Sequence, residues 1–438
     1  MVSPQRRREI IDALRRGTVP QRGLDAFAVG MDRYRDAITQ EFETVRAGGG
    51  IFKAARGEYG SGKTFFARWL QERAKQINMA TAEVQISETE TPLHRLETVY
   101  RRLMERLATA DSENGAFRSV IDAWFYTLEE DVLAAGEVSR NDPDRLLERT
   151  DELMEQRLAA ISKTAPMFAV ALRGYRRAVA QGDSAVAEGL LAWLMAQPNV
   201  AASTKRFAGI KDDIDHFGAL SFLQGLLVVL RDSGHAGLVI VLDEVETLQR
   251  VRGDVRDKGL NALRQLIDEV YSGRFPGLYV LITGTPAFFD GPQGVHRLPP
   301  LAQRLETNFG TDVRFDNQRA VQVRLLGFDL DSLVEVGLKI RDIYAEGSSS
   351  AAQIKSLADD TYLHDLARAV AGDLGGRIGI APRLYLKKLV ADVLDRIDQH
   401  PEFNPRQHYS LTISPAELNE IERNVRAAAN VDDIELTL

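Results

Sequence analysis

The sequence contains no cysteine among its 438 residues. This absence excludes disulfide bonds, thiolate nucleophiles and cysteine-ligated zinc sites together. The chain also lacks an apolar run near the roughly 18 residues that a membrane-spanning helix requires. Its basic N-terminal residues are not followed by the apolar stretch of a signal peptide. We therefore expect a cytoplasmic protein that does not enter a membrane.

Charge of either sign is not in large excess. The 55 basic and 63 acidic residues give a net charge of −8. Such a chain is not suited to coat nucleic acid indiscriminately, but one basic face is compatible with this value, so DNA stays open as a partner. Hydrophobic residues make up 44% and charged residues 27%, which is typical of a globular protein. The length favours two or three sub-domains.

Short apolar runs predict the strands of a parallel sheet. Leu238–Leu242 and Leu278–Thr283 are continuous apolar runs, which is typical of central strands covered on both faces. Ile51–Ala55 precedes a glycine-rich loop and a helical pattern, and this order is the context of a phosphate-binding loop. Further short strands are predicted at Thr81–Ser87 and Val321–Leu325. The fold class we predict is α/β.

Helical patterns fill most of the remaining sequence. Residues 93–235 have this pattern almost throughout, and we interpret them as an all-helical insertion between two strands. In the tail, Ser414 and Glu417 form a capping box with Pro415 at the first turn, which predicts the start of a helix. The predicted domains are 1–92 (N-terminal core), 93–235 (insertion), 236–326 (C-terminal core), 327–399 (helical lid) and 400–438 (tail with one helix).

The glycine-rich loop matches G-x-x-x-x-G-K-[ST] at every position. Its glycines allow the backbone to curl so that consecutive N–H groups point at phosphate, and the following helix adds its positive N-terminal end. Lys63 is expected to contact the β- and γ-phosphates of ATP, and the Thr64 hydroxyl to bind Mg²⁺. The predicted nucleotide-binding residues are Gly57, Glu58, Tyr59, Gly60, Ser61, Gly62, Lys63 and Thr64.

Two carboxylates follow the apolar run that begins at Leu238. A buried strand would place them beside the phosphates, with Asp243 in the Mg²⁺ shell and Glu244 as the base that activates water. This pair favours hydrolysis over transfer of phosphate to a small molecule. The sequence has no Asn-Lys-x-Asp motif, which argues against guanine as the base.

Three further positions are candidates for nucleotide sensing. Thr283 is our choice for a hydroxyl that holds the lytic water, with Thr285 in reserve. Arg304 resembles the arginine that oligomeric ATPases insert into a neighbouring subunit, and Arg297 competes for that role. Arg383 begins a helix of the predicted lid and is expected to detect the γ-phosphate, with Arg377 as the alternative. The segment Val19–Gly30 is interpreted either as a cover for adenine or as a plain connector.

AAA+ ATPases of the Orc/Cdc6-like origin-recognition branch have a similar ordered set of residues, which here is Gly57–Thr64, Asp243, Glu244, Thr283, Arg304 and Arg383. The sequence resembles this branch. Four stretches, beginning at Ile10, Arg56, Pro92 and Gly237, more narrowly resemble the BrxD-type ATP-binding family of bacterial BREX phage-defence systems. The resemblance implies an AAA+ core with a C-terminal lid, ATP and Mg²⁺ as cofactors, and a role beside a helicase or other defence-system proteins. It also implies that ATP can assemble a homo-oligomer. The origin-recognition relatives carry a winged helix, for which the residues after the lid are too few.

Three functions stay open from the sequence. The first is an ATP-hydrolysing switch in which the lid closes and reopens. The second is a DNA-binding loader that uses a basic N-terminal cluster, and the third is a scaffold that binds ATP without hydrolysing it. The basic cluster consists of Arg6, Arg7, Arg8, Arg15 and Arg16.

Overall fold

The protein is built around a five-stranded parallel sheet, seen in a computed structural model that describes residues 2–136, 138–310, 312–373, 382–414, 416–418 and 423. The strands are β1 (Ile51–Arg56), β2 (Ala80–Gln85), β3 (Leu238–Asp243), β4 (Leu278–Gly284) and β5 (Gln322–Arg324). Their order is β2-β3-β4-β1-β5, and every pair is parallel. The predicted α/β class with a parallel sheet is therefore confirmed. Because β4 lies between β1 and β3, the carboxyl ends of these three strands meet at one edge.

Alternate residues of the central strands supply two separate hydrophobic cores. In β3, Leu238, Ile240 and Leu242 face one core, while Val239 and Val241 face the other. This alternation is what a strand with both faces covered requires, because successive side chains point to opposite faces. Helices α2 (Asp32–Arg46) and α3 (Lys63–Gln76) pack on the second face. Helices α4 (Leu96–Glu105), α10 (His216–Asp232) and α11 (Gly253–Tyr271) contribute to the first core.

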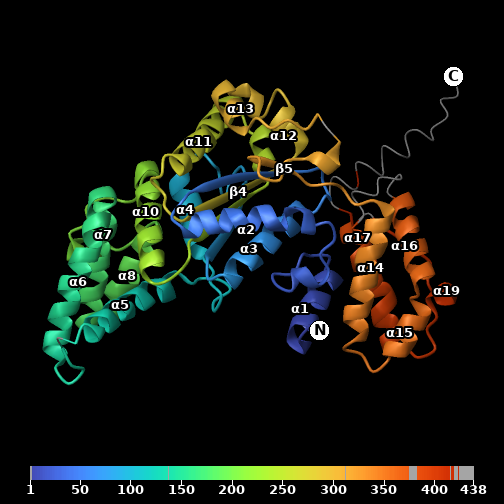
Figure 1. Cartoon of the computed structure of the whole chain (residues 1–438), viewed down its shortest axis with the longest axis horizontal. Helices are drawn as coiled ribbons and strands as arrows, with labels where there is room; N and C mark the ends of the chain where they lie inside the picture. Colours follow the sequence, from blue (N-terminus) through green and yellow to red (C-terminus); the bar gives the residue numbers. More distant parts are fainter. Residues whose placement is uncertain are drawn as a thin grey trace.

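Most of the helices between β2 and β3 extend away from the sheet as an arm, whereas α4 and α10 stay beside the sheet (Figure 1). The arm comprises α5 (Phe117–Ala134), α6 (Pro143–Thr164), α7 (Pro166–Ala180), α8 (Ser184–Leu194) and α9 (Ala202–Ala208). Its side chains join the same core as the first face of the sheet, so the arm is continuous with the core domain. Short elements follow β3 and β4: η2 (Val245–Gln249), α12 (Pro286–Asp290), η3 (Val295–Arg297), α13 (Pro299–Leu305) and η4 (Val313–Phe315).

A second helical body lies at the opposite end of the molecule from the arm (Figure 1). It contains α14 (Leu330–Ala345), α15 (Ala351–Leu357), α16 (Asp360–Asp373), α17 (Pro382–Lys387), a π-helical segment (Lys388–Leu394), α18 (Asp395–Gln399) and α19 (Pro405–His408). We call this body the lid. The short helix α19 was not foreseen from the sequence. No helix in the described ranges is long and apolar enough to cross a membrane.

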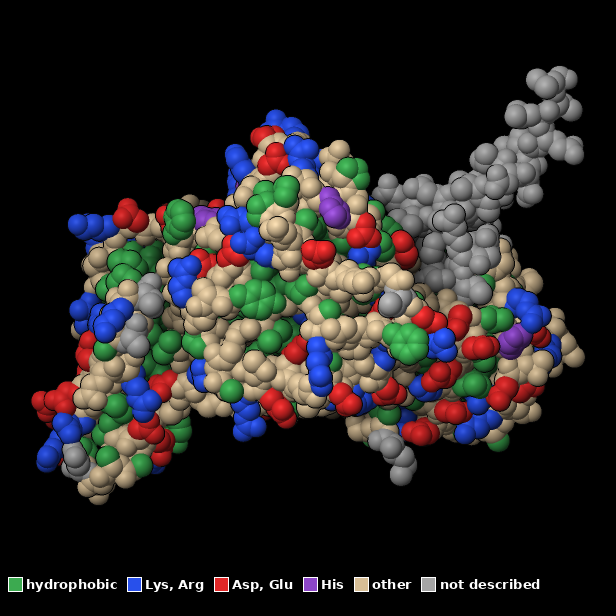
Figure 2. Space-filling view, turned by 45° about the horizontal axis from the view of Figure 1, so that its top comes forward, with side chains coloured by type: hydrophobic (Ala, Val, Ile, Leu, Met, Phe, Trp, Pro, Cys, Tyr) green, Lys and Arg blue, Asp and Glu red, His purple; other side chains and the backbone are tan. Residues whose placement is uncertain are grey.

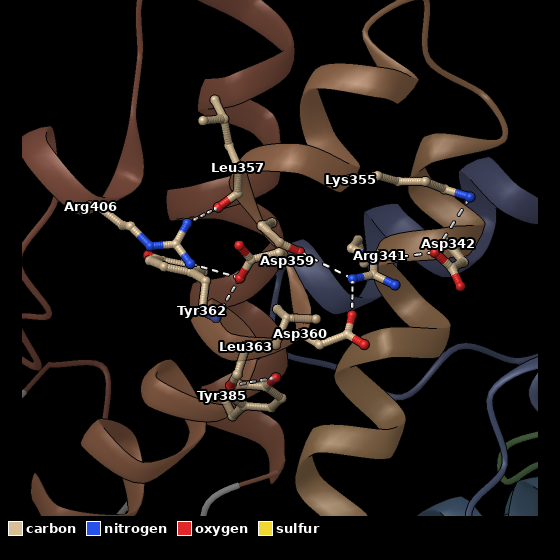
Figure 3. Close-up of polar contacts among 11 residues, drawn as sticks. Arg341, Asp342, Lys355, Leu357, Asp359, Asp360, Tyr362, Leu363, Tyr385 and Arg406 are labelled. Carbon is tan, nitrogen blue, oxygen red and sulfur yellow. Dashed lines mark hydrogen bonds and ion pairs between the residues drawn. The ribbon is translucent and has the colours of Figure 1, made fainter.

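Two arginines connect the turns of the lid (Figure 3). Arg341 of α14 donates to Asp360 at 2.6 Å and to the Ala358 carbonyl at 3.3 Å. Arg406 of α19 donates to Asp359 at 2.7 Å and to the Leu357 carbonyl at 3.0 Å. Both therefore hold the turn between α15 and α16, which fixes the lid as one packed unit.

The N-terminal helix α1 (Pro4–Arg15) packs on the lid as well. Arg15 forms a two-pronged ion pair with Asp395, with distances of 2.6 and 2.8 Å, and Asp395 also accepts from the Tyr344 hydroxyl. Arg6 pairs with Glu9, so part of the basic N-terminal cluster serves local packing. Basic and acidic side chains are interspersed over the face shown in Figure 2, without a continuous basic stripe on it.

Candidate functional site

The glycine-rich loop joins β1 to α3 in a tight curve. Gly60 and Gly62 have φ angles of 80° and 88°, a left-handed region that glycine adopts readily. A Cβ at Gly57 would lie only 2.2 Å from the Ser61 hydroxyl oxygen, so a larger residue would force the loop open. The Ser61 hydroxyl is buried and has no hydrogen-bond partner. The loop therefore forms a narrow cradle with an unused polar group at the N-terminus of a helix, which suits an anion such as phosphate.

Lys63 at the start of α3 lies over this cradle. Its ammonium donates to the Gly57 carbonyl at 2.9 Å and to the Glu58 carbonyl at 3.3 Å. The Tyr59 ring centroid is 4.9 Å from the same nitrogen. Burial lowers the pKa of Lys63, and the nearby carboxylates of Glu246 and Asp243 oppose that shift. A desolvated cation beside the loop is well placed to meet phosphate oxygens.

One carboxylate connects the end of β3 to both neighbouring elements. Asp243 accepts from the Thr64 hydroxyl at 3.2 Å and, through its other oxygen, from the Thr283 hydroxyl in a close contact. The Thr283 oxygen also accepts the backbone N–H of Glu244 at 3.0 Å. Because β4 lies between β1 and β3, Thr283 stands between the loop and the carboxylates. Thr285 instead occupies the N-cap position of α12.

Glu244 sits in a constrained conformation directly after β3. Its φ and ψ angles are 60° and 45°, a left-handed geometry that costs on the order of 1 kcal/mol or more outside glycine. Its carboxylate accepts from the Gln85 amide at 2.7 Å. Gln85 ends β2 and is paired in register with Asp243. Sequence reasoning missed Gln85, since nothing in the chain signals which strand lies beside β3.

Glu246 is a second residue that the sequence did not reveal. It is 5% exposed and lies 3.9 Å from the Lys63 ammonium, too far for a hydrogen bond. Neither carboxylate oxygen has a hydrogen-bond partner. Burial raises the pKa of Glu246 to about 7, although the charge of Lys63 acts in the opposite direction. The only sequence signal was its place two residues after Glu244 on the same turn.

A pocket with a volume of about 370 Å³ runs from the loop to the lid. The segment Val19–Gly30 contributes Val19, Pro20, Phe27 and Val29 to its wall. Arg383 of α17 lines the lid side, and one of its nitrogens donates to the Glu417 carbonyl at 2.8 Å. The site is therefore bounded by the core, the N-terminal segment and the lid. Arg377, the alternative to Arg383, lies outside the described residues.

The two arginine-finger candidates lie away from this pocket. Arg304 of α13 pairs with Asp268 of α11, with one contact at 3.1 Å, and donates to the Pro300 carbonyl. Arg297 pairs with Asp257 of the same helix. Neither side chain lines the pocket of its own chain. Their partners are surface carboxylates, so both arginines are anchored locally.

The oxygen atoms at the site suit a magnesium ion that is bound partly by protein and partly by a nucleotide. They do not form a complete set of protein ligands for a metal. No group of three or more His, Cys, Asp or Glu suited to a metal occurs in the described part of the chain. Mg²⁺ is commonly bound by one or two carboxylates together with substrate phosphates and water. The Thr64 hydroxyl and the Asp243 carboxylate, 3.2 Å apart, supply such a partial set. The nucleotide would complete it.

A parallel sheet, a glycine-rich loop and paired carboxylates at one edge together form an arrangement compatible with the core of a P-loop ATPase. A family model described as "BREX system ATP-binding protein BrxC/D" matches residues 2–413. The chain therefore belongs to this family of BREX system ATP-binding proteins. Membership implies that the chain binds ATP and places it in a BREX phage-defence system. A search of curated proteins finds no match.

The raised pKa of Glu246 predicts a pH-dependent stability. Between its ordinary pKa of 4.5 and about 7, the folded protein holds a proton that the unfolded chain has released. Stability is therefore lost as the pH rises through this window. In urea unfolding at pH 8, we expect the free energy of unfolding of Glu246→Gln to exceed that of the wild type by roughly 1–3 kcal/mol. This difference should shrink as the pH falls toward 5.

The matched control for this comparison is Glu402→Gln, which alters an exposed carboxylate of the lid. It should change the stability little at either pH. A gain for Glu246→Gln that is the same at both pH values would contradict the assignment of the proton to Glu246.

Proposed function

We propose that the chain is a Mg²⁺-dependent ATPase whose cycle opens and closes the lid against the core. The observation that carries this proposal is the Glu244 carboxylate, held by Gln85 at the rim of the nucleotide pocket beside Asp243. A scaffold that only binds ATP needs no carboxylate fixed at this place. The constrained backbone of Glu244 supports the same reading, because strain of this kind is concentrated at functional sites.

Hydrolysis would use the chain's own groups in distinct roles. Glu244 accepts a proton from water as the water oxygen bonds to the γ-phosphorus, and the bond from that phosphorus to the bridging oxygen breaks to leave ADP. Thr283 orients the water, while Lys63 and the loop N–H groups stabilise negative charge on the phosphates. Mg²⁺, when bound by Thr64 and Asp243, neutralises part of that charge. Gln85 is a positioning residue for Glu244.

The lid and the arm would transmit the cycle to other components of the defence system. Arg383 reaches the pocket from the lid, so a γ-phosphate contact there would favour the closed arrangement. A helicase or another defence protein is the expected receiver of this movement. The basic N-terminal cluster adds little support for a DNA loader, since Arg6, Arg7 and Arg15 are in ion pairs.

Glu244→Gln tests hydrolysis directly. The variant keeps the size of the side chain but removes the base, so we expect kcat for ATP to fall by about 10²- to 10⁴-fold while ATP still binds. Phosphate release and equilibrium ATP binding measure the two effects. Gln85→Ala should reduce kcat by less, because it only loosens Glu244. A wild type that turns over no faster than Glu244→Gln would refute the enzyme proposal.

We propose further that Arg304 completes the site of a neighbouring subunit. The Glu244→Gln variant, which should retain bound ATP, should then be a monomer without ATP and a dimer or larger ring with ATP. Measurements of molecular mass in solution would show this change. Arg304→Ala should lose at least about tenfold in kcat, the loss of one charge-assisted contact in the transition state. Mixing Arg304→Ala with Glu244→Gln should restore part of the activity. In a mixed assembly, the intact Glu244 of an Arg304→Ala subunit can meet the intact Arg304 of a neighbouring Glu244→Gln subunit.

Arg297→Ala serves as the matched control in this mixing experiment. It removes a similarly anchored arginine from the neighbouring turn and should leave activity near that of the wild type. A chain that stays monomeric with ATP, or an Arg304→Ala variant with full activity, would exclude a role in trans.

A further inference from the structure

The C-terminal segment, defined here by residues 413, 414 and 416–418, is docked on the lid beside the nucleotide pocket. Ile413 and Leu418 are 6% and 5% exposed and belong to the hydrophobic core that the lid shares with α1 and α3. The family model ends at residue 413, so most of this segment lies beyond the family match. Its attachment must therefore be explained from this chain's own contacts.

Glu417 is the main polar anchor of this segment. Its carboxylate pairs with Lys388 at 2.8 Å and with Lys387 at 3.5 Å. It also accepts the Ser414 backbone N–H at 3.0 Å, which is one half of the capping box expected from the sequence. Partial burial alone would raise the pKa of Glu417, but hydrogen bonds from Lys388 and Ser414 lower it to about 2. The anchor is therefore ionised at any physiological pH.

The same residue holds Arg383 through its backbone. The Glu417 carbonyl accepts from one nitrogen of the Arg383 guanidinium at 2.8 Å. A Cβ at Gly17 would lie 3.4 Å from the other terminal nitrogen of Arg383. The guanidinium thus lies close to both the N-terminal turn and the C-terminal segment. Gly17 and Arg383 both line the nucleotide pocket.

The helix that carries Arg383 changes its winding at the anchored lysine. α17 ends at Lys387, and the π-helical segment begins at Lys388. π-helical turns are rare and are frequently found at functional sites. Lys388 is also buried and pairs with Asp392 within the same turn at 3.2 Å. Glu417 therefore fixes the point from which α17 extends toward the pocket.

We infer that the C-terminal segment positions Arg383 for contact with the terminal phosphate of a nucleoside triphosphate, with Glu417 as the positioning residue. This inference rests on the proposed function, in which Arg383 senses the γ-phosphate from the lid. Glu417 itself does not touch the nucleotide. It acts by holding α17 through two lysines and by orienting the guanidinium through its carbonyl. Loss of the anchor should weaken triphosphate binding selectively.

The test uses the full chain and measures equilibrium binding of two ligands, Mg²⁺ with a non-hydrolysable ATP analogue and Mg²⁺ with ADP. Glu417→Ala should weaken binding of the analogue by about tenfold, the scale of one charge-assisted contact, and leave ADP affinity within about twofold. Arg383→Ala should show the same selectivity. The double variant should bind the analogue no more weakly than Arg383→Ala alone, because both changes act through one contact.

Two further variants keep the result interpretable. Glu402→Ala removes an exposed glutamate of the same lid and should bind both ligands as the wild type does. Glu417→Gln keeps the size and the bond to Ser414 but loses the charge, so it serves if Glu417→Ala folds poorly. Glu417→Gln should weaken binding of the ATP analogue by a smaller factor than Glu417→Ala does.

The outcomes separate this inference from the proposed function. A wild type that binds neither nucleotide refutes both. The decisive quantity is the ratio of the affinities for the ATP analogue and for ADP, called the preference below. If Arg383→Ala leaves this preference unchanged, Arg383 does not sense the γ-phosphate and the inference fails with that role. If Arg383→Ala loses the preference while both Glu417 variants keep it, only the positioning role is wrong. Equal weakening of both ligands by Glu417→Ala also overturns it, since that result marks a purely structural residue.

Discussion

The Asp243 carboxylate is shared by two hydroxyl groups, and the rest of the site depends on this sharing. Thr64 reaches it from the first turn of α3, and Thr283 reaches it from the end of β4. Thr283 in turn accepts the backbone N–H of Glu244. The loop, the two central strands and the catalytic candidate are therefore fixed by one short chain of hydrogen bonds. Charge-assisted bonds of this kind are the stronger ones in proteins, and here they lie at a buried edge where water competes little.

Around this edge, residues of the N-terminal segment and of the lid line the pocket. The N-terminal turn at Gly17 and the lid residue Arg383 both line the pocket and lie close together, and the ion pair between Arg15 and Asp395 ties α1 to the lid. The pocket thus lies where the core meets the lid, whose buried side chains join the same hydrophobic cluster as α3 and one face of the sheet. A ligand that contacts both sides can change the balance between open and closed arrangements only through its differential affinity for them. The γ-phosphate, as the group that distinguishes ATP from ADP, is the natural source of that difference.

Much of the architecture could be predicted from the sequence, because apolar runs and a complete phosphate-loop motif are local signals. The strands at β1, β3 and β4 were expected within about one residue of where they lie, in line with the limits on element boundaries. The strand order was not readable, and so Gln85 was missed: only the β2–β3 register brings it to Glu244. Glu246 was missed for a related reason, since burial is a tertiary property. The domain boundaries and the roles of Thr283, Arg304 and Arg383 stay predictions.

The most direct test of the account is ATP binding with and without Mg²⁺, compared between the wild type and Asp243→Asn. If Thr64 and Asp243 complete the shell of a nucleotide-bound magnesium ion, Mg²⁺ should tighten ATP binding to the wild type by about tenfold or more. The same addition should have little effect on Asp243→Asn, whose amide is a poorer ligand and disturbs both hydroxyl contacts. Identical ATP affinity of the wild type with Mg²⁺ present or chelated, or an undiminished Mg²⁺ effect in Asp243→Asn, would contradict the site described above.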